Sequence, residues 1–259
     1  MNIIDFKLDL GDDAIPIQPL WESSATQKYP LGASFQDEWG NKFRYAQNGA
    51  VAIIAGCFVQ NAILGGATTT LQSQTVVAAA TNIGDTRIFI NGITTAQAVG
   101  LYNNGFAGIS ITTGATHTYT RRIKFSSAIA ITGGTSFIDL YEPLHVALTT
   151  SDRIALQINP YRNIIVAPTT ATGAILGGIH GNISIAHYCW VQSKGWFAFR
   201  VKDVTTNIGP GPVIRAGTTV GTGITGVEVD TLGAYREIIG MSTALWLDEG
   251  AGFIYLTCE

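Results

Sequence analysis

The chain has 259 residues, with 15 Lys and Arg against 18 Asp and Glu, a net charge of −3 and a pI near 5.8. This balance excludes nucleic acid as the expected partner, because nucleic-acid-binding surfaces carry a basic stripe. Charged residues make up only 13% of the chain, against a usual ~25%, yet no run reaches the ~18 consecutive apolar residues of a membrane span. We therefore expect no membrane partner, and infer that other subunits cover part of the surface or that the core is large and dry.

The first 28 residues predict an extended N-terminal arm with a strand near its tip. Apolar and charged side chains alternate from residue 4 to residue 10, as in a half-buried or edge strand. Pro16 and Pro19 follow and favour an extended backbone. Such a strand can pair with its own body or with the sheet edge of a neighbour, and the sequence leaves both open. Four apolar residues of this stretch are interface candidates: Ile4, Phe6, Leu8 and Leu10.

Residues 29–259 predict a single β-rich body, an antiparallel sandwich or barrel, with possible subdivision near residues 86 and 170. Tyr29–Gly49 has the pattern of a hairpin, in which Gly40 and Asn41 supply the positive φ angles of a tight turn. From Thr86 to Thr170 short Ile, Val, Thr and Phe runs alternate with Gly-containing turns, which favours an all-β fold.

Helical spacing of apolar residues is nearly absent from the sequence. We expect at most one short helical turn in each of Ile63–Leu71 and Thr94–Tyr102. Asp152–Pro160 alternates as a strand does, and Pro160 ends it.

The most aromatic stretch lies late in the chain. Tyr188–Val201 predicts two strands joined by a turn at residues 193–195, with two of the five Trp residues inside it. Such a hairpin is only marginally stable alone and must pack on further strands. Ile238–Leu247 and Phe253–Cys258 predict the two closing strands.

Residues that could carry chemistry are scattered. The three Cys are widely spaced and predict reduced, buried thiols rather than disulfides. The four His match no metal-ligand spacing, and no nucleophile elbow or phosphate loop is present. Two acid pairs, Asp37 with Glu38 and Asp248 with Glu249, invite a glycosidase interpretation. Both pairs fall at predicted turns, where exposed acids lack the raised pKa of an acid catalyst, so we expect no enzyme, cofactor or metal.

Exposed aromatic and cationic residues are the remaining candidates. Trp residues at strand spacing could form a sugar-binding platform, although aromatics concentrate more often in cores and subunit interfaces. Trp21 and Trp39 are interface candidates on that basis. Arg121 and Arg122, with Lys124, form the single cationic cluster of the sequence, which favours a solvated face or a partner contact over a phosphate site.

Five motifs occur in an order that resembles a known family. They are Tyr-Pro-Leu-Gly with Trp-Gly-Asn-Lys-Phe-Arg-Tyr-Ala (29–46), Leu-Tyr-Glu-Pro-Leu (140–144), Ile-Asn-Pro-Tyr (158–161), Tyr-Cys-Trp-Val-Gln-Ser-Lys-Gly (188–195) and Ile-Ile-Gly-Met-Ser-Thr-Ala-Leu (238–245). Together they resemble the capsid decoration or cement proteins of tailed bacteriophages and their relatives in environmental phages. The weakest match is Thr86–Lys124.

The resemblance implies a non-enzymatic β-rich virion protein, made in the host cytoplasm, that binds the major capsid protein on the outside of the capsid, often as a homotrimer. The sequence is compatible with subunits that bridge their neighbours through apolar contacts and tethered arms. Two alternatives stay open: a tail or fibre component, and a carbohydrate-binding adhesion module.

Overall fold

The computed structural model describes the chain in ten stretches. All regular elements in them are β-strands, which confirms the all-β prediction. The described residues are 17–61, 72–93, 96–112, 117–131, 136–167, 173–200, 213–216, 223–225, 238–244 and 251–258.

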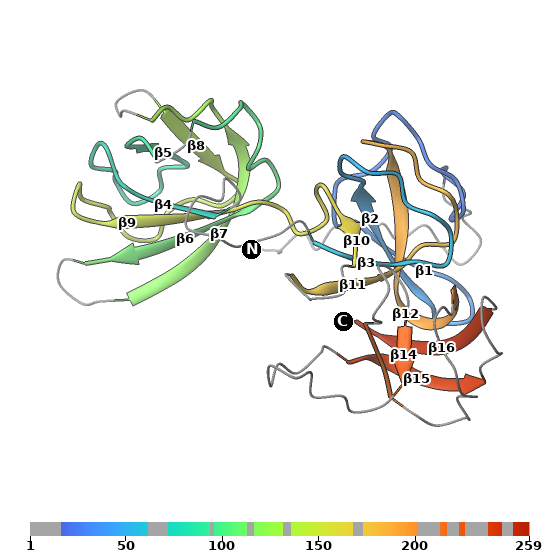
Figure 1. Cartoon of the computed structure of the whole chain (residues 1–259). Helices are drawn as coiled ribbons and strands as arrows, with labels where there is room; N and C mark the ends of the chain where they lie inside the picture. The colour runs from blue at the N-terminus through green and yellow to red at the C-terminus, as the bar shows by residue number, and fades with distance from the viewer. Residues whose placement is uncertain are drawn as a thin grey trace. The chain divides into compact units, whose positions relative to one another are not determined.

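The chain forms two compact units, each drawn in Figure 1. Unit 1 combines Met1–Ala62 with Pro160–Glu259, and unit 2 is the intervening Ile63–Asn159. Residue 86 lies inside unit 2 and residue 170 inside unit 1, so these boundaries differ from the subdivisions considered above.

Unit 2 is a nearly closed six-stranded antiparallel barrel. The first and last strands of its sheet are β4 (Gln72–Val76) and β5 (Arg87–Ile90). They are joined by an isolated bridge between Val77 and Ile90. Two backbone bonds flank the bridge, from Ala78 N to Phe89 O (2.8 Å) and from Asn91 N to Val76 O (3.0 Å). The two edges of the sheet are therefore bonded to each other at this point, which nearly closes the barrel. In spatial order the strands are β4 (Gln72–Val76), β9 (Arg153–Gln157), β6 (Phe106–Ile111), β7 (His117–Ser126), β8 (Ser136–Leu140) and β5 (Arg87–Ile90).

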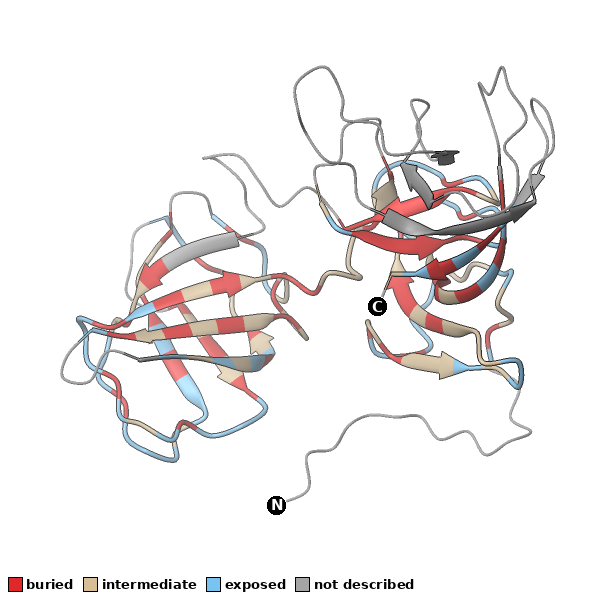
Figure 2. Ribbon diagram, turned by 90° about the horizontal axis from the view of Figure 1, so that it is seen from below, coloured by how far each residue is buried: buried red, intermediate tan, exposed pale blue. Residues whose placement is uncertain are grey.

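Alternation at period two builds much of the barrel interior. β6 and β8 alternate buried and half-buried residues along their whole length, visible in Figure 2 as alternating colours on the strands. Because side chains point to opposite faces at period two, these two strands contribute every second residue to the core. The interior consists mainly of fully buried Ile and Leu, among them Ile88, Ile109, Ile123, Ile138, Ile154 and Leu156.

Unit 2 is inserted between two neighbouring strands of unit 1. β3 (Phe58–Gln60) runs into the barrel and β10 (Ile165–Val166) follows it, and the two pair antiparallel through Val59 and Val166. The chain thus leaves and re-enters unit 1 at adjacent positions, as in tolerated domain insertions.

Because unit 2 is inserted into unit 1, the two units should fold independently. We expect a fragment of residues 63–159 to fold alone with one cooperative thermal transition, because its core and strand pairing are internal. The reciprocal chain, with a short Gly-Ser linker joining Ala62 to Pro160, should also fold. Near-ultraviolet circular dichroism and calorimetry of both proteins provide the measurement. Loss of cooperative melting in the 63–159 fragment would show that the barrel depends on unit 1.

Unit 1 is organised around one ten-stranded antiparallel sheet. The main path contains eight strands, and β2 and β1 branch from β12. The strands of the path are β10, β3, β11 (Ile175–Gly178), β12 (Tyr188–Arg200), β16 (Ala251–Thr257), β15 (Ile238–Ala244), β13 (Val213–Ala216) and β14 (Gly223–Thr225), with β2 (Lys42–Gln47) and β1 (Ser34–Gln36) off it.

The turn predicted at residues 193–195 is wrong. β12 runs unbroken for 13 residues, pairing first with β2 and then with β16. The register with β2 shifts between Gln192 and Lys194, so the sequence signal of a turn is an irregularity within one strand. Gly195 has φ of +101°, and a Cβ there would lie 2.0 Å from Asn41 Oδ1. Glycine is required by this close approach, not by a reversal of the chain.

The hairpin predicted within Tyr29–Gly49 is confirmed, with its strands at β1 and β2. β1 and β2 pair antiparallel around the turn at Asp37–Asn41, and Gly40 has φ of +82°. Asn41 contributes through its side chain instead of a positive φ. Its Nδ2 donates to Asp37 Oδ2 (2.8 Å), and its Oδ1 accepts from Trp196 N (3.0 Å), which joins the turn to β12.

The expected helical turn at Thr94–Tyr102 is not formed in its described part. Residues 99–104 are hydrogen-bonded turns, and Gln97 pairs with Ile129 in an isolated bridge. The tertiary pairing of Gln97 overrides the weak local helical pattern. The other expected helical turn, Ile63–Leu71, lies outside the described residues.

Residues 17–28, which the sequence places in the arm, are fixed to unit 1 by Gln18. Its side chain is buried, and Nε2 donates to the carbonyls of Glu22 (2.9 Å) and Tyr188 (2.8 Å). Tyr45 Oη donates to Gln18 Oε1 (2.6 Å), and the Trp190 indole donates to the Gln18 carbonyl (3.1 Å). Gln18 is therefore part of the core of unit 1.

The thiols fit the expected reduced and largely buried state. The three Cys form no disulfide; Cys57 and Cys189 are buried in unit 1, and Cys258 is half-buried. Burial raises the pKa of the Cys189 thiol to about 12, so it stays protonated at neutral pH.

Candidate interaction surface

The outer surface of β5, β8 and β7 carries a cluster of aromatic rings beside an ion pair. Outward residues of β5 and β8 are directly paired, Arg87 with Asp139 and Phe89 with Phe137. The Phe137 ring centroid lies 6.2 Å from that of Phe89 and 6.0 Å from that of Phe125. We call these five residues the Arg–Phe patch.

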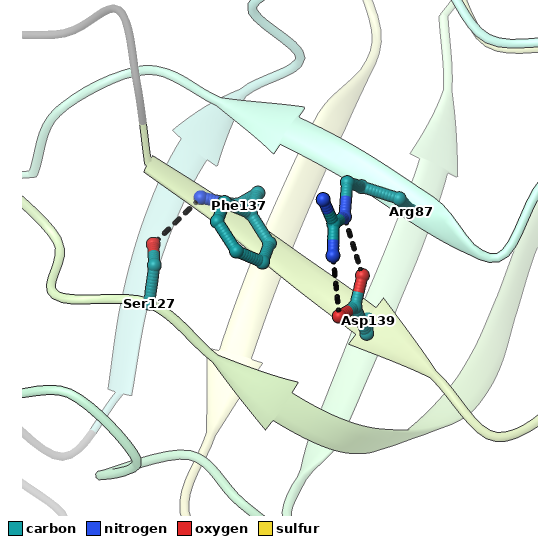
Figure 3. A network of polar contacts seen from close by, with 4 residues as sticks. All are labelled: Arg87, Ser127, Phe137 and Asp139. Atoms are coloured by element: carbon teal, nitrogen blue, oxygen red, sulfur yellow. Dashed lines mark hydrogen bonds and ion pairs between the residues drawn. The ribbon is translucent and has the colours of Figure 1, made fainter.

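Hydrogen bonds fix the side chain of Arg87 and the backbone of Phe137 in the Arg–Phe patch (Figure 3). Arg87 Nε and Nη2 donate to the two carboxylate oxygens of Asp139 at 2.7 and 2.9 Å, and the guanidinium carbon lies 4.0 Å from the Phe137 ring centroid. The hydrogen bond to Asp139 raises the pKa of Arg87, so the guanidinium stays charged. Phe137 N donates to Ser127 Oγ (2.8 Å). A bidentate pair stacked on an aromatic ring is a preorganised contact surface.

Two exposed cations lie on β7 beside the Arg–Phe patch. Lys124 and Phe125 are consecutive residues between the buried Ile123 and Ser126, at a register shift that turns both outward. Arg122 is exposed, with its guanidinium 5.4 Å from the Tyr141 ring centroid. Within the described part of the chain neither Arg122 nor Lys124 makes an ion pair.

A second aromatic surface lies on β12 and β16 of unit 1. Trp196 and Tyr255 are directly paired and pack edge to face at 5.3 Å, with Phe253 further along β16. The exposed fractions are 52% for Trp196, 36% for Tyr255 and 50% for Phe253. Large aromatic rings left in water on a rigid strand pair indicate a contact site.

The eight predicted interface residues have different outcomes. Ile4, Phe6, Leu8 and Leu10 lie outside the described residues. Trp21 and Trp39 are exposed by 65% and 80% in unit 1, the latter at the tip of the Asp37–Asn41 turn.

Arg121 and Arg122 belong to unit 2, whereas Trp21 and Trp39 belong to unit 1. Arg121 makes local contacts: Nη2 donates to His145 Nδ1 (2.7 Å), and Nη1 lies 3.6 Å from Glu142. Arg122 remains available beside the Arg–Phe patch.

The acid pair at residues 37 and 38 has a structural role. Asp37 Oδ1 accepts from the backbone N–H groups of Trp39 (3.1 Å) and Asn41 (2.8 Å), which closes the β1–β2 turn. Glu38 is exposed. Asp248 and Glu249 lie outside the described residues. Among the residues described, no three His, Cys, Asp or Glu side chains are grouped to hold a metal ion, and no helix is long and apolar enough to cross a membrane.

The Arg–Phe patch was not predicted from the sequence. The sequence feature that points to the patch is the alternation in residues 87–90 and 136–140, where charged and aromatic side chains share one face of each strand. The alternation alone does not show that these two strands are neighbours in the same register. That pairing is long-range and became visible only in the folded barrel.

Comparison with protein-family models, curated proteins and solved structures finds no match.

Proposed function

We propose that this chain is a structural virion protein, a capsid decoration or cement protein that binds the outer capsid surface and stabilises the shell by bridging subunits. The observation that carries the proposal is the ordered set of five motifs from residue 29 to residue 245, which resembles that family. Its partners are the major capsid protein and further copies of itself in a homotrimer, and its role is binding rather than catalysis.

Two surface properties support this proposal. The low content of charged residues, 13%, fits a protein whose surface is partly covered by other subunits. The Arg–Phe patch and the Trp196–Tyr255 pair supply rigid aromatic and Arg contacts, the side chains enriched at protein interfaces.

The mechanism is attachment at several points. Each protomer contributes a β body and an N-terminal segment that contacts a neighbour, so that linked contacts of modest affinity combine into strong attachment. Apolar residues of the segment supply the buried area, namely Ile4, Phe6, Leu8 and Leu10.

Truncation tests this mechanism, and the position of the cut matters. Deletion of residues 1–18 would remove Gln18 and leave its partners Tyr45 and Trp190 without their buried bonds. Deletion of residues 1–16 keeps Gln18, so we expect a folded protein that loses at least tenfold in affinity for capsids, measured by co-sedimentation with particles stripped of the protein. A truncated chain that binds as tightly as the full chain would contradict the arm mechanism.

The location on the particle tests the function itself. We expect imaging of virions at subunit resolution to place the β-rich body on the outer face of the capsid lattice. If the protein is found on the tail instead, the tail or fibre alternative is favoured. If virions do not contain the protein, both the capsid and the tail functions are contradicted.

A carbohydrate-binding module is the second candidate, favoured by the exposed Trp196 beside Tyr255. It predicts that glycans quench Trp fluorescence and that Trp196→Ala removes the effect. A glycan array without hits would exclude it.

A further inference from the structure

The nearly closed barrel of unit 2 restricts how another chain can attach to it. Its terminal strands β4 and β5 are bonded to each other near Val77 and Ile90. A further strand cannot be added where these edges are bonded to each other, which favours binding of an incoming segment to an outer face through its side chains.

The outer face of β5, β8 and β7 combines apolar and positive character. Phe89 is 39% exposed, its ring packs against that of Phe137, and Phe137 in turn packs against Phe125. Asp139 neutralises Arg87, which leaves the positive charges of Arg122 and Lys124 without an acidic partner in the described part of the chain. A complementary ligand needs apolar side chains followed or flanked by carboxylates.

The N-terminal sequence has that composition. In residues 3–13, Ile-Ile-Asp-Phe-Lys-Leu-Asp-Leu-Gly-Asp-Asp, five apolar side chains alternate with or precede charged ones, and four Asp stand against one Lys. Asp12 and Asp13 come directly after the apolar stretch, so they can meet cations beside the aromatic rings. Both the charge and the hydrophobic pattern match the barrel face.

We propose that residues 3–13 of one copy bind the outer face of β5, β8 and β7 of a neighbouring copy. The apolar residues of the segment cover Phe89, Phe125 and Phe137, and Asp12 and Asp13 pair with Arg122 and Lys124. This inference rests on the arm mechanism of the proposed function and identifies the surface that receives the arm.

A charge swap in the full-length chain tests the pairing. The barrel variant Arg122→Glu with Lys124→Glu and the arm variant Asp12→Lys with Asp13→Lys are each expected to weaken self-association at least tenfold at low salt, because like charges then face each other. A chain that carries all four substitutions should recover a dissociation constant for self-association within about threefold of that of the parent chain. Sedimentation velocity from 1 to 100 µM gives the measurement.

Matched controls separate this contact from general charge effects. Arg153→Glu changes an exposed cation on β9, away from the Arg–Phe patch, and should leave association unchanged. Phe89→Ser should weaken association, whereas Ile83→Ser, at a more exposed apolar residue of the same unit, should not. Circular dichroism verifies that each variant is folded.

The outcomes distinguish this inference from the proposed function. The inference that the arm binds a neighbouring copy is contradicted if the parent chain is monomeric at 100 µM, including the case in which the arm binds its own barrel. It is also contradicted if the combined variant fails to recover association. Capsid co-sedimentation of the same variants is read separately. If the charge swap fails to restore association but the variants still bind capsids, the barrel binding site is refuted and the proposed function is not. If the chain associates with itself but never binds capsids, the proposed function is refuted and the barrel binding site is not.

Discussion

Replacement of Trp190 by alanine is expected to lower the free energy of unfolding of unit 1 by about 3–5 kcal/mol. Trp190 is only 2% exposed, and its ring packs against Tyr45 (5.0 Å), Tyr29 (5.1 Å) and Phe35 (6.0 Å). Alanine removes these contacts and leaves a cavity that the surrounding strands cannot fill. It also removes the indole donor to the Gln18 carbonyl, so the N-terminal anchor of unit 1 loosens.

The control for Trp190 lies on the same strand. Trp196→Ala removes an equal side chain that is 52% exposed, so we expect a loss below about 1 kcal/mol. Guanidinium unfolding followed by far-ultraviolet circular dichroism measures both variants. Hydrogen exchange should show weaker protection in β2 and β12 of the Trp190 variant and unchanged protection in the barrel. Equal losses for the two variants would show that Trp190 is not the centre of this core.

The second large effect is expected at Asp152, a fully buried carboxylate held by hydrogen bonds. Its oxygens accept from the backbone N–H groups of Thr112 (2.8 Å) and Thr149 (2.7 Å) and from both Thr hydroxyls. These bonds join the start of β9 to the end of β6. Asp152→Asn replaces one acceptor by a donor that faces other donors, so we expect barrel stability to fall by about 2–4 kcal/mol.

The effect of Asp152 should depend on pH. Burial by itself raises the pKa of Asp152, but the hydrogen bonds from Thr149 and Thr112 outweigh it and the pKa is lowered. The folded pKa then lies below the unfolded value of about 3.9, so the contribution is complete above that value and is lost as the pH falls through the folded pKa.

Thermal unfolding from pH 2.5 to 7 measures this dependence. The difference between the parent chain and Asp152→Asn should be constant near neutral pH and shrink below about pH 4. Glu142→Gln, at an exposed acid of the same unit, is the control and should show little difference at any pH. A gap that stays constant down to pH 2.5 would contradict the role of the ionised Asp152.

Local patterns were sufficient for much of the secondary structure. Alternation at period two identified β9, and the closing strand predicted at Phe253–Cys258 corresponds to β16. The Asp37–Asn41 turn was recognised because Gly40 accepts a positive φ. The same reasoning failed at Gly195, since a glycine needed for close approach to Asn41 has the same sequence signature as a turn. It also missed that Gln18 belongs to the core, because its partners Tyr45 and Tyr188 are distant in the chain.

By itself, the sequence determined that this protein is all-β, and that its first residues form an apolar and acidic segment, because composition and two-residue alternation are local properties. The tertiary structure alone decided that unit 2 is an inserted barrel and that Arg87, Phe89, Phe137 and Asp139 form one surface. These features depend on which strands are neighbours and in which register. Strand pairing joins residues far apart in the chain, as Arg87 and Asp139 are, and its choice depends on closure of the barrel around a common core.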